Sequence, residues 1–156
     1  MSPLRILAVA VALVATPLVV HAQREKLPPD DLDIVERKWP DAKKSNTGIR
    51  YVVEVAGTAP ILQPGDMVMV NYTGAFLNGK VFDQMHDKLH PFMFRVDRGL
   101  VIDGWDQILQ LMRPGDKWIV IVPPELAYGR RGSPPKVPPY ATLVFEMEIL
   151  GVKKDT

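Results

Sequence analysis

The sequence predicts an α+β domain, in which an antiparallel half-barrel sheet of about five strands wraps around one short helix. From residue 48 onward, short runs rich in β-branched and aromatic residues alternate with turn signals. A single segment of that region places its apolar residues at helical spacing. With 156 residues, 47% of them apolar and 24% charged, the chain has the size and composition of one domain plus an additional segment.

Turn residues bound each expected strand. Pro64-Gly65-Asp66 and Pro114-Gly115-Asp116 each predict a turn that opens a strand, and Asn78-Gly79 predicts a tight hairpin. The strands expected from these signals are 49–55, 67–76, 80–82, 92–96, 117–122 and 141–152. Asn71 belongs to a glycosylation sequon, but its place inside a central strand argues against modification.

The expected helix spans 104–112, where Trp105, Ile108, Leu109 and Met112 follow helical spacing. Asp103 stands just before this helix and is interpreted as its N-cap. Between the last two strands lies a long segment with six prolines over 123–139. Long connections of this kind are where functional residues concentrate.

The first 22 residues are typical of a secretory signal peptide. Arg5 gives a positive start, residues 6–20 are almost entirely aliphatic, and Val20-His21-Ala22 predicts cleavage before Gln23. The alternative is an uncleaved anchor, but the apolar run is shorter than the ~20 residues that span a bilayer, and Pro17 interrupts it. We therefore expect an exported protein with no membrane attachment after cleavage.

Residues 23–47 form a charged, proline-rich extension. Within it, Leu32, Val35 and Trp39 have spacings near those of one helical face, which predicts a short amphipathic helix. Such a segment could be an arm that docks a partner, or a spacer that lays Trp39 against the main domain. The spacer interpretation is favoured, because too few apolar residues are present to build a second core.

Composition excludes several chemistries. The chain contains no cysteine, so a disulfide, a thiolate nucleophile and a cysteine-bound zinc site are all ruled out. Of the 19 basic residues one is Arg5, so the chain after cleavage balances 18 acidic residues, and no nucleic-acid partner is indicated. His86 and His90 are four residues apart, but Pro91 follows and the segment is expected to be a loop, so no metal site is predicted.

Aromatic residues are abundant from Tyr72 to Phe145, and by themselves they would indicate a plain aromatic core. The motifs around them are more specific: VNYTG at 70–74, NGKVFD at 78–83, PFMF at 91–94, VIDGW at 101–105, PPELAYG at 123–129 and VPPYATLVF at 137–145. Taken in order, these motifs resemble the signatures of the FKBP family of peptidyl-prolyl isomerases. The resemblance covers a domain at 48–153, with its best-matching core at 64–152.

The resemblance implies a hydrophobic pocket between the helix and the sheet, with Trp105 as its floor. The remaining substrate-binding residues that it implies are Tyr72, Phe82, Phe92, Val101, Ile102, Val137 and Phe145. It also implies two catalytic residues, Asp83 at the rim and Tyr128, whose hydroxyl would bind a substrate carbonyl beside the backbone N–H of Ile102. Asp83 could instead be a structural carboxylate, and Tyr128 could merely cap its loop.

The activity that the resemblance implies is cis-trans isomerisation of X-Pro bonds in exported or folding proteins, by a monomer without a cofactor. Expected ligands are unfolded or folding polypeptides that contain proline, and macrolide inhibitors. The alternative is a chaperone or binding module that holds peptides in the same pocket without turnover. A bacterial periplasm is the favoured compartment, with secretion or an endoplasmic-reticulum lumen as alternatives.

Three residues depart from the family pattern. Ser133 and Lys136 do so at the outer rim of the pocket, and Ile108 does so in the packing beneath Trp105.

Overall fold

The computed structural model describes residues 24–153, so the predicted signal peptide at 1–22 lies outside the described residues. Within that range no helix is long and apolar enough to cross a membrane. The elements, in chain order, are α1 (Pro29–Lys38), β1 (Lys43–Lys44), β2 (Arg50–Val55), β3 (Met67–Phe76), β4 (Val81–Met85), β5 (Phe92–Arg95), α2 (Asp103–Leu109), β6 (Lys117–Val122), a 3-10 turn (Pro124–Leu126) and β7 (Leu143–Lys153).

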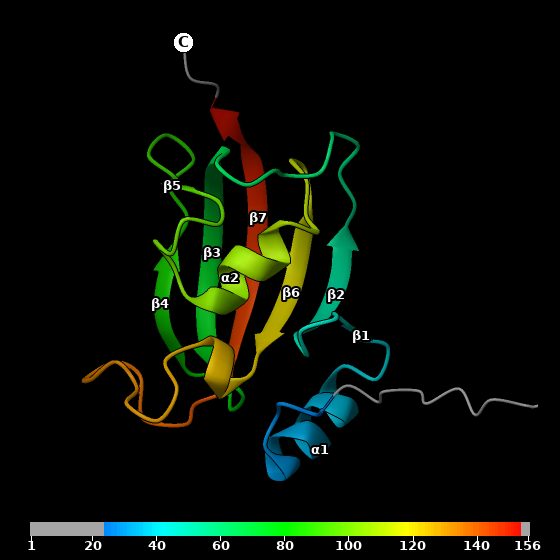
Figure 1. Cartoon of the computed structure of the whole chain (residues 1–156), viewed down its shortest axis with the longest axis vertical. Helices are drawn as coiled ribbons and strands as arrows, with labels where there is room; N and C mark the ends of the chain where they lie inside the picture. Colours follow the sequence, from blue (N-terminus) through cyan, green and yellow to red (C-terminus); the bar gives the residue numbers. More distant parts are fainter. Residues whose placement is uncertain (1–23, 154–156) are drawn as a thin grey trace, which may run out of the picture.

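All the strands join one antiparallel sheet, and α2 lies across one face of it (Figure 1). The strand order is β1-β2-β6-β7-β3-β4, and β5 pairs with the N-terminal part of β3, from Met67 to Val70. The predicted α+β class is confirmed, with seven strands in place of about five. One addition is β1, which carries no β pattern and forms because the Ser45 hydroxyl and N–H tie the following turn to Ile49.

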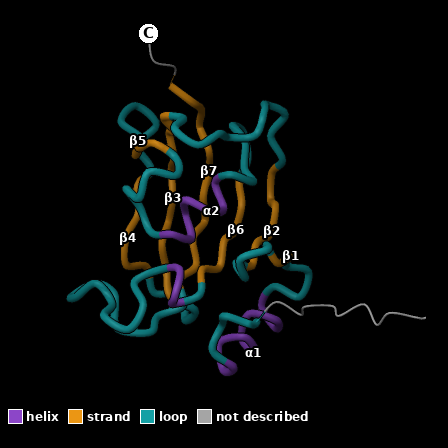
Figure 2. The backbone as a smooth tube through the Cα atoms, viewed as in Figure 1, coloured by secondary structure: helices purple, strands orange, loops and turns teal. Residues whose placement is uncertain are grey.

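The long central strands β3 and β7 pair over most of their length, from Met67 opposite Lys153 to Phe76 opposite Leu143. Strand β3 alternates in burial, and Val68 and Val70 are fully buried beneath α2. Asn71 is also buried, at 2% exposure, in the central strand where the sequon was expected. The backbone trace in Figure 2 separates these strands from the long loops that join them.

Helix α2 differs from the prediction at both ends. Ile102 has an extended conformation (φ −59°, ψ 148°) and is the N-cap residue, so the interpretation of Asp103 as the N-cap is wrong. Asp103 is the first helical residue, where its negative charge is favourable beside the helix N-terminus. The helix ends at Leu109, since the N–H groups of Leu111 and Met112 bond the carbonyls three residues back and tighten the chain into a turn.

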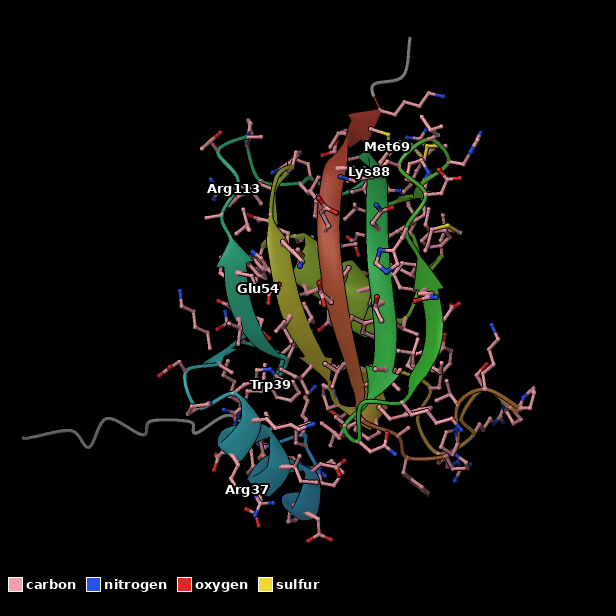
Figure 3. The ribbon with its side chains drawn as sticks, turned by 180° about the vertical axis from the view of Figure 1, so that it is seen from behind. Arg37, Trp39, Glu54, Met69, Lys88 and Arg113 are labelled. Carbon is pink, nitrogen blue, oxygen red and sulfur yellow. The ribbon has the colours of Figure 1, made fainter. Side chains whose placement is uncertain are left out.

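A second, smaller apolar cluster lies on the opposite face of the sheet, beneath α1. Val35 of the helix packs there with Leu27 and with Ile121 of β6, and all three are at most 4% exposed. Trp39 packs against this cluster where α1 meets the sheet, as Figure 3 shows. The predicted amphipathic helix therefore forms, and Trp39 lies against the domain as expected. The few apolar residues of α1 are enough to form this cluster, because residues of the sheet supply the rest of it.

Polar contacts hold this extension on the domain. The hydroxyl of Thr142 donates to Asp31 at 2.6 Å, and Lys38 donates to the carbonyl of Leu77 at 2.6 Å. Glu25 accepts hydrogen bonds from Lys44 and Arg50, each at 2.8 Å. Partial burial raises the pKa of Glu25, but these bonds and the backbone N–H of Leu27 outweigh burial and hold the pKa at about 2.

Candidate active site

A pocket opens between α2, the β3–β5 side of the sheet and the loop that follows the 3-10 turn. Its lining residues are Tyr72, Phe82, Asp83, Phe92, Leu100, Val101, Ile102, Trp105, Tyr128 and Phe145. Most of these were predicted from the sequence, and they come from separate elements that the fold brings together. Asp83 is the one acidic residue among them, so the site is an aromatic cavity with a single carboxyl group at its edge.

Trp105 is 4% exposed and lies in the first turn of α2. The rings of Tyr72 and Phe145 meet it nearly edge-on, at centroid distances of 4.9 Å and 5.2 Å. Edge-to-face contacts of this kind are favourable and fix the ring planes. The indole N–H is buried and finds no acceptor among residues 24–153.

The aromatic wall requires a glycine in β3. A Cβ atom built on Gly74 would lie 2.8 Å from the ring of Phe82 and 2.9 Å from the ring of Phe145, closer than such atoms approach. Only a residue without a side chain lets both rings close over the strand at this position. The packing explains why a glycine stands in the middle of a central strand, where it costs backbone entropy.

Asp83 stands at the pocket edge, and its side chain is 43% exposed. The hydroxyl of Tyr72 donates to it at 2.8 Å, and the ammonium of Lys136 lies 3.8 Å from its other oxygen. Burial, together with the hydrogen bond and negative charge of Asp83, raises the pKa of Tyr72 well above its usual range. Tyr72 therefore remains a protonated donor, and Asp83 is both bonded to a nearby tyrosine and placed at the pocket.

Tyr128 is positioned by the backbone of its loop. Gly129 donates to the carbonyl of Pro124 at 2.8 Å and accepts from the N–H of Tyr140 at 2.9 Å, which holds the loop at both ends. The Tyr128 side chain lines the pocket and its hydroxyl bonds no other residue in the described part of the chain. Burial and the charge of Asp83 raise its pKa, so the hydroxyl is a neutral donor at physiological pH.

Asp106 is a structural residue that the sequence did not reveal. It is 7% exposed, and its two oxygens accept the N–H groups of Asp97 at 2.8 Å and Gly99 at 2.9 Å. These bonds fix a loop in which Asp97 has φ 55° and Gly99 has φ 65°. The loop leads to Ile102, which lines the pocket and whose backbone N–H has no partner within 24–153. The sequence signal that could have identified Asp106 is a carboxylate on the buried face of an otherwise apolar helix.

Two assignments differ between prediction and structure. Val137 was expected to be a substrate-binding residue, but it is 3% exposed and packs in the main core, outside the pocket lining. Its backbone forms two hydrogen bonds with Ser133, which turn the side chain inward. Leu100 lines the pocket although it is 63% exposed, and an apolar residue in a loop gives no periodic signal that could have identified it.

The two loop histidines bond different groups. His86 contacts the hydroxyl of Thr73 at 2.7 Å, and His90 contacts Asp87 at 2.9 Å. Both follow the end of β4, in the loop that the sequence predicted. Across residues 24–153 there is no group of three side chains suited to hold a metal ion.

Comparison with known families agrees with the fold and the pocket. The family model for the FKBP-type peptidyl-prolyl cis-trans isomerases matches residues 59–150, which is more than half of the chain. The chain therefore belongs to the FKBP family. The matched range contains every residue that lines the pocket.

Individual relatives agree with this assignment. The chain is 40% identical to a probable FKBP-type peptidyl-prolyl cis-trans isomerase from Haemophilus influenzae, over 74% of this chain and 47% of that protein. It is 43% identical to FkpA from Escherichia coli K12, over 71% of this chain and 40% of that protein. The chain thus spans less than half the length of these two curated relatives.

Solved structures share the fold. A peptidyl-prolyl isomerase from Pseudomonas syringae is similar with a TM-score of 0.70 and 34% identity, over 80% of this chain and 92% of that one. The crystal structure of Escherichia coli FkpA gives a TM-score of 0.69 and 39% identity, over 79% of this chain and 59% of that one.

Proposed function

We propose that this chain catalyses the cis-trans isomerisation of X-Pro peptide bonds. The observation that carries the proposal is the pocket itself, in which an aromatic floor at Trp105 faces a carboxylate at Asp83 and a free hydroxyl at Tyr128. Membership of the FKBP family supports the same reaction. Proline is the natural target, because its cis form lies only ≈ 0.5–1 kcal/mol above the trans form.

The pocket fits this reaction for a physical reason. Twisting an amide removes its resonance, which gives a barrier of ~18–20 kcal/mol, and the twisted amide has less charge separation than the planar one. Water solvates the planar amide better, so transfer into an aromatic cavity favours the twisted form. The walls formed by Phe82, Phe92 and Phe145 supply such a cavity around Trp105.

Each polar group has a distinct part in the proposed mechanism. The Tyr128 hydroxyl and the Ile102 N–H, both without protein acceptors in the described residues, bind carbonyls that flank the proline and hold the peptide bent. Asp83, kept in place by the Tyr72 hydroxyl, faces the reacting amide and stabilises its altered charge distribution. The mechanism needs no covalent step.

We further propose that the protein acts on exported polypeptides as they fold. The apolar N-terminal segment, read as a signal peptide at 1–22, supports export, and a bacterial periplasm is the compartment we favour. Uncatalysed prolyl isomerisation takes 10–100 s at 25 °C, which limits the folding of many proteins and gives an isomerase its purpose there.

Turnover of a proline-containing peptide tests the proposal, measured by protease coupling or NMR exchange. We expect the wild type to accelerate exchange, and Asp83→Ala and Tyr128→Phe to lose part of that rate. Two variants serve as matched controls: Asp87→Ala removes an exposed carboxylate near β4, and Tyr140→Phe removes a hydroxyl from the same loop as Tyr128, and neither residue lines the pocket. If the wild type shows no rate above the uncatalysed exchange, the chain is a peptide-binding module instead.

A further inference from the structure

The 127–142 loop, which connects the 3-10 turn to β7, is attached to the N-terminal extension near both of its ends. Just before the loop, the ammonium of Lys26 lies 2.8 Å from a carboxylate oxygen of Glu125. At the end of the loop, the hydroxyl of Thr142 donates to Asp31 of α1 at 2.6 Å. In Figure 1 the orange loop and α1 both lie at the lower end of the sheet. None of these four residues lines the pocket, so the extension supports the loop from outside the site.

The two attachments differ in strength. The side chains of Lys26 and Glu125 are 28% and 48% exposed, and an exposed ion pair of this kind contributes little. Thr142 is 4% exposed, and its hydroxyl donates to a charged acceptor, which makes a short and strong hydrogen bond. A buried hydroxyl that loses its acceptor is costly. The bond between Thr142 and Asp31 is therefore the main attachment.

Between these attachments the extension and the loop do not pack tightly. Leu27, Pro28 and Leu32 of the extension line one hollow of about 580 Å³ together with Gly129 and Tyr140 of the loop. Because a hollow takes the place of side-chain packing there, the position of the loop on this side depends on its polar attachments.

The main attachment lies close to Tyr128 along the hydrogen-bonded backbone. The N–H of Tyr140 donates to the carbonyl of Gly129 at 2.9 Å, which joins the two ends of the loop. Thr142 follows Tyr140 closely in the chain, and Tyr128 directly precedes Gly129. A movement of Thr142 is therefore transmitted through this bond to the neighbour of Tyr128. The Tyr128 hydroxyl must lie within about 3 Å of a substrate carbonyl to bind it.

The same helix also contacts the hairpin that leads to Asp83. Lys38, in the last turn of α1, donates to the carbonyl of Leu77 at 2.6 Å. Leu77 packs against the cluster around Val35 and lies between β3 and β4, the strand that contains Asp83. The contact of Lys38 is exposed, so we expect it to be the weaker support. α1 thus holds both segments from which the polar groups of the site come.

We propose that the N-terminal extension positions the 127–142 loop, and with it the hydroxyl of Tyr128, for the reaction in the pocket. Asp31 and Thr142 are the positioning residues, because neither lines the pocket and both act through the loop. This inference rests on the proposed function, since it assigns a part in that reaction to a segment outside the pocket.

Thr142→Val is the most direct test, because it removes the hydroxyl and keeps the shape of the side chain. Turnover is measured where circular dichroism shows every variant to be folded. We expect kcat/KM to fall about two- to tenfold, at most the loss for Tyr128→Phe, because the loop places one neutral hydrogen bond. Asp31→Ala should lose a similar factor. Asp31→Asn should keep most of the rate, because its amide oxygen still accepts the Thr142 hydroxyl.

Ser45→Ala is the matched control. Ser45 is 8% exposed, and its hydroxyl accepts the N–H of Ile49 at 3.1 Å, so this variant also removes a buried hydroxyl that ties the extension to the domain, but away from the loop. It should destabilise the protein and leave kcat/KM near that of the wild type. A rate loss equal to that of Thr142→Val would show that any destabilisation lowers the rate, and would overturn the proposal.

A double-mutant cycle with Tyr128→Phe separates positioning from a structural role. If Thr142 acts by placing the Tyr128 hydroxyl, the variant that lacks both hydroxyls should be no slower than Tyr128→Phe alone. A structural contribution would instead multiply the two losses. Multiplied losses, or a Thr142→Val protein with the wild-type rate, would contradict the proposal.

The free protein reports on positioning without turnover. Backbone amide signals of residues 128–132 should shift, and their order parameters should fall, in Thr142→Val but not in Ser45→Ala. Unchanged shifts and order parameters in Thr142→Val would overturn the proposal.

Peptide affinity distinguishes failure of this inference from failure of the isomerase proposal. If the wild type isomerises no peptide, the same cycle is measured on the affinity for a proline-containing peptide by NMR titration. A loss in Thr142→Val that depends on the Tyr128 hydroxyl would then retain the positioning role while the isomerase proposal falls. Losses that multiply, or no loss, would overturn both. A wild type that isomerises peptides, with Thr142→Val equally fast, would overturn the positioning role alone.

Discussion

Two faces of the same sheet carry different kinds of cluster, and β7 contributes to both. Phe145 faces the pocket, whereas its neighbour Val144 packs beneath α1. Under α1, polar groups that border the cluster bond one another, as Thr142 does with Asp31. Around the pocket the indole N–H of Trp105 and the hydroxyl of Tyr128 bond no other described residue. Spare hydrogen-bonding capacity beside an aromatic cavity distinguishes a binding surface from one that only stabilises the fold.

The largest expected difference between the faces is in stability. Trp105→Ala should lower the free energy of unfolding by about 3–5 kcal/mol, because a buried tryptophan leaves a cavity that its four aromatic neighbours cannot fill. Trp39→Ala on the α1 face should cost about 1–2 kcal/mol, since Trp39 is only partly buried. Urea denaturation of both variants measures the contrast, and equal losses would contradict it.

Within the pocket region, Asp83 and Asp106 should separate activity from stability. Asp83→Ala should reduce kcat/KM by about 10- to 100-fold, the range for a charged hydrogen-bond partner, with little effect on unfolding. Asp106→Ala should instead cost about 2–4 kcal/mol of unfolding free energy, because the N–H groups of Asp97 and Gly99 lose their acceptor. Parallel rate and denaturation measurements decide the matter. An Asp83→Ala protein as unstable as Asp106→Ala would make Asp83 a structural residue.

A smaller effect is expected from the hydroxyl of Tyr128. Tyr128→Phe keeps the ring and removes one neutral hydrogen bond, so kcat/KM should fall about two- to tenfold. Tyr140→Phe should change the rate by less than twofold, because Tyr140 belongs to the same loop but lies outside the pocket lining. Similar rates for the two variants would leave Tyr128 as a residue that only shapes the loop.

The smallest effect is expected on the α1 face, where the free energy of unfolding should depend on pH. The folded pKa of Glu25 is about 2, against an ordinary value of 4.5, so its stabilisation is complete above about pH 4.5 and is lost as the pH falls toward 2. With solvent screening of this partly exposed group, the loss should be about 1 kcal/mol. Denaturation of the wild type and Glu25→Gln at pH 6 and pH 3 measures it. Identical pH dependence in both proteins would show that Glu25 contributes nothing.

The sequence predicted the strands well, because Pro64-Gly65-Asp66 and Asn78-Gly79 mark turns by local chemistry that the fold does not override. It predicted most of the pocket lining through ordered motifs. The misplacement of Val137 has a local cause that no sequence pattern marks, since its two backbone hydrogen bonds with Ser133 turn that side chain into the core. The role of Asp106 was not predicted, because its partners are backbone N–H groups of a loop whose conformation the sequence does not specify. The helix at the start of the domain and the contact of Trp39 were predicted, but not the sheet residues that complete that cluster.

The central claim is that X-Pro bonds are bound and isomerised at Trp105. The chain has three tryptophans, so an NMR titration with a proline-containing peptide can follow three indole N–H signals while it measures cis-trans exchange in the peptide. We predict that the Trp105 signal shifts with saturation, that those of Trp39 and Trp118 stay nearly unchanged, and that exchange exceeds the uncatalysed rate in proportion to bound peptide. Exchange at the uncatalysed rate, or a shift confined to Trp39 or Trp118, would contradict the account.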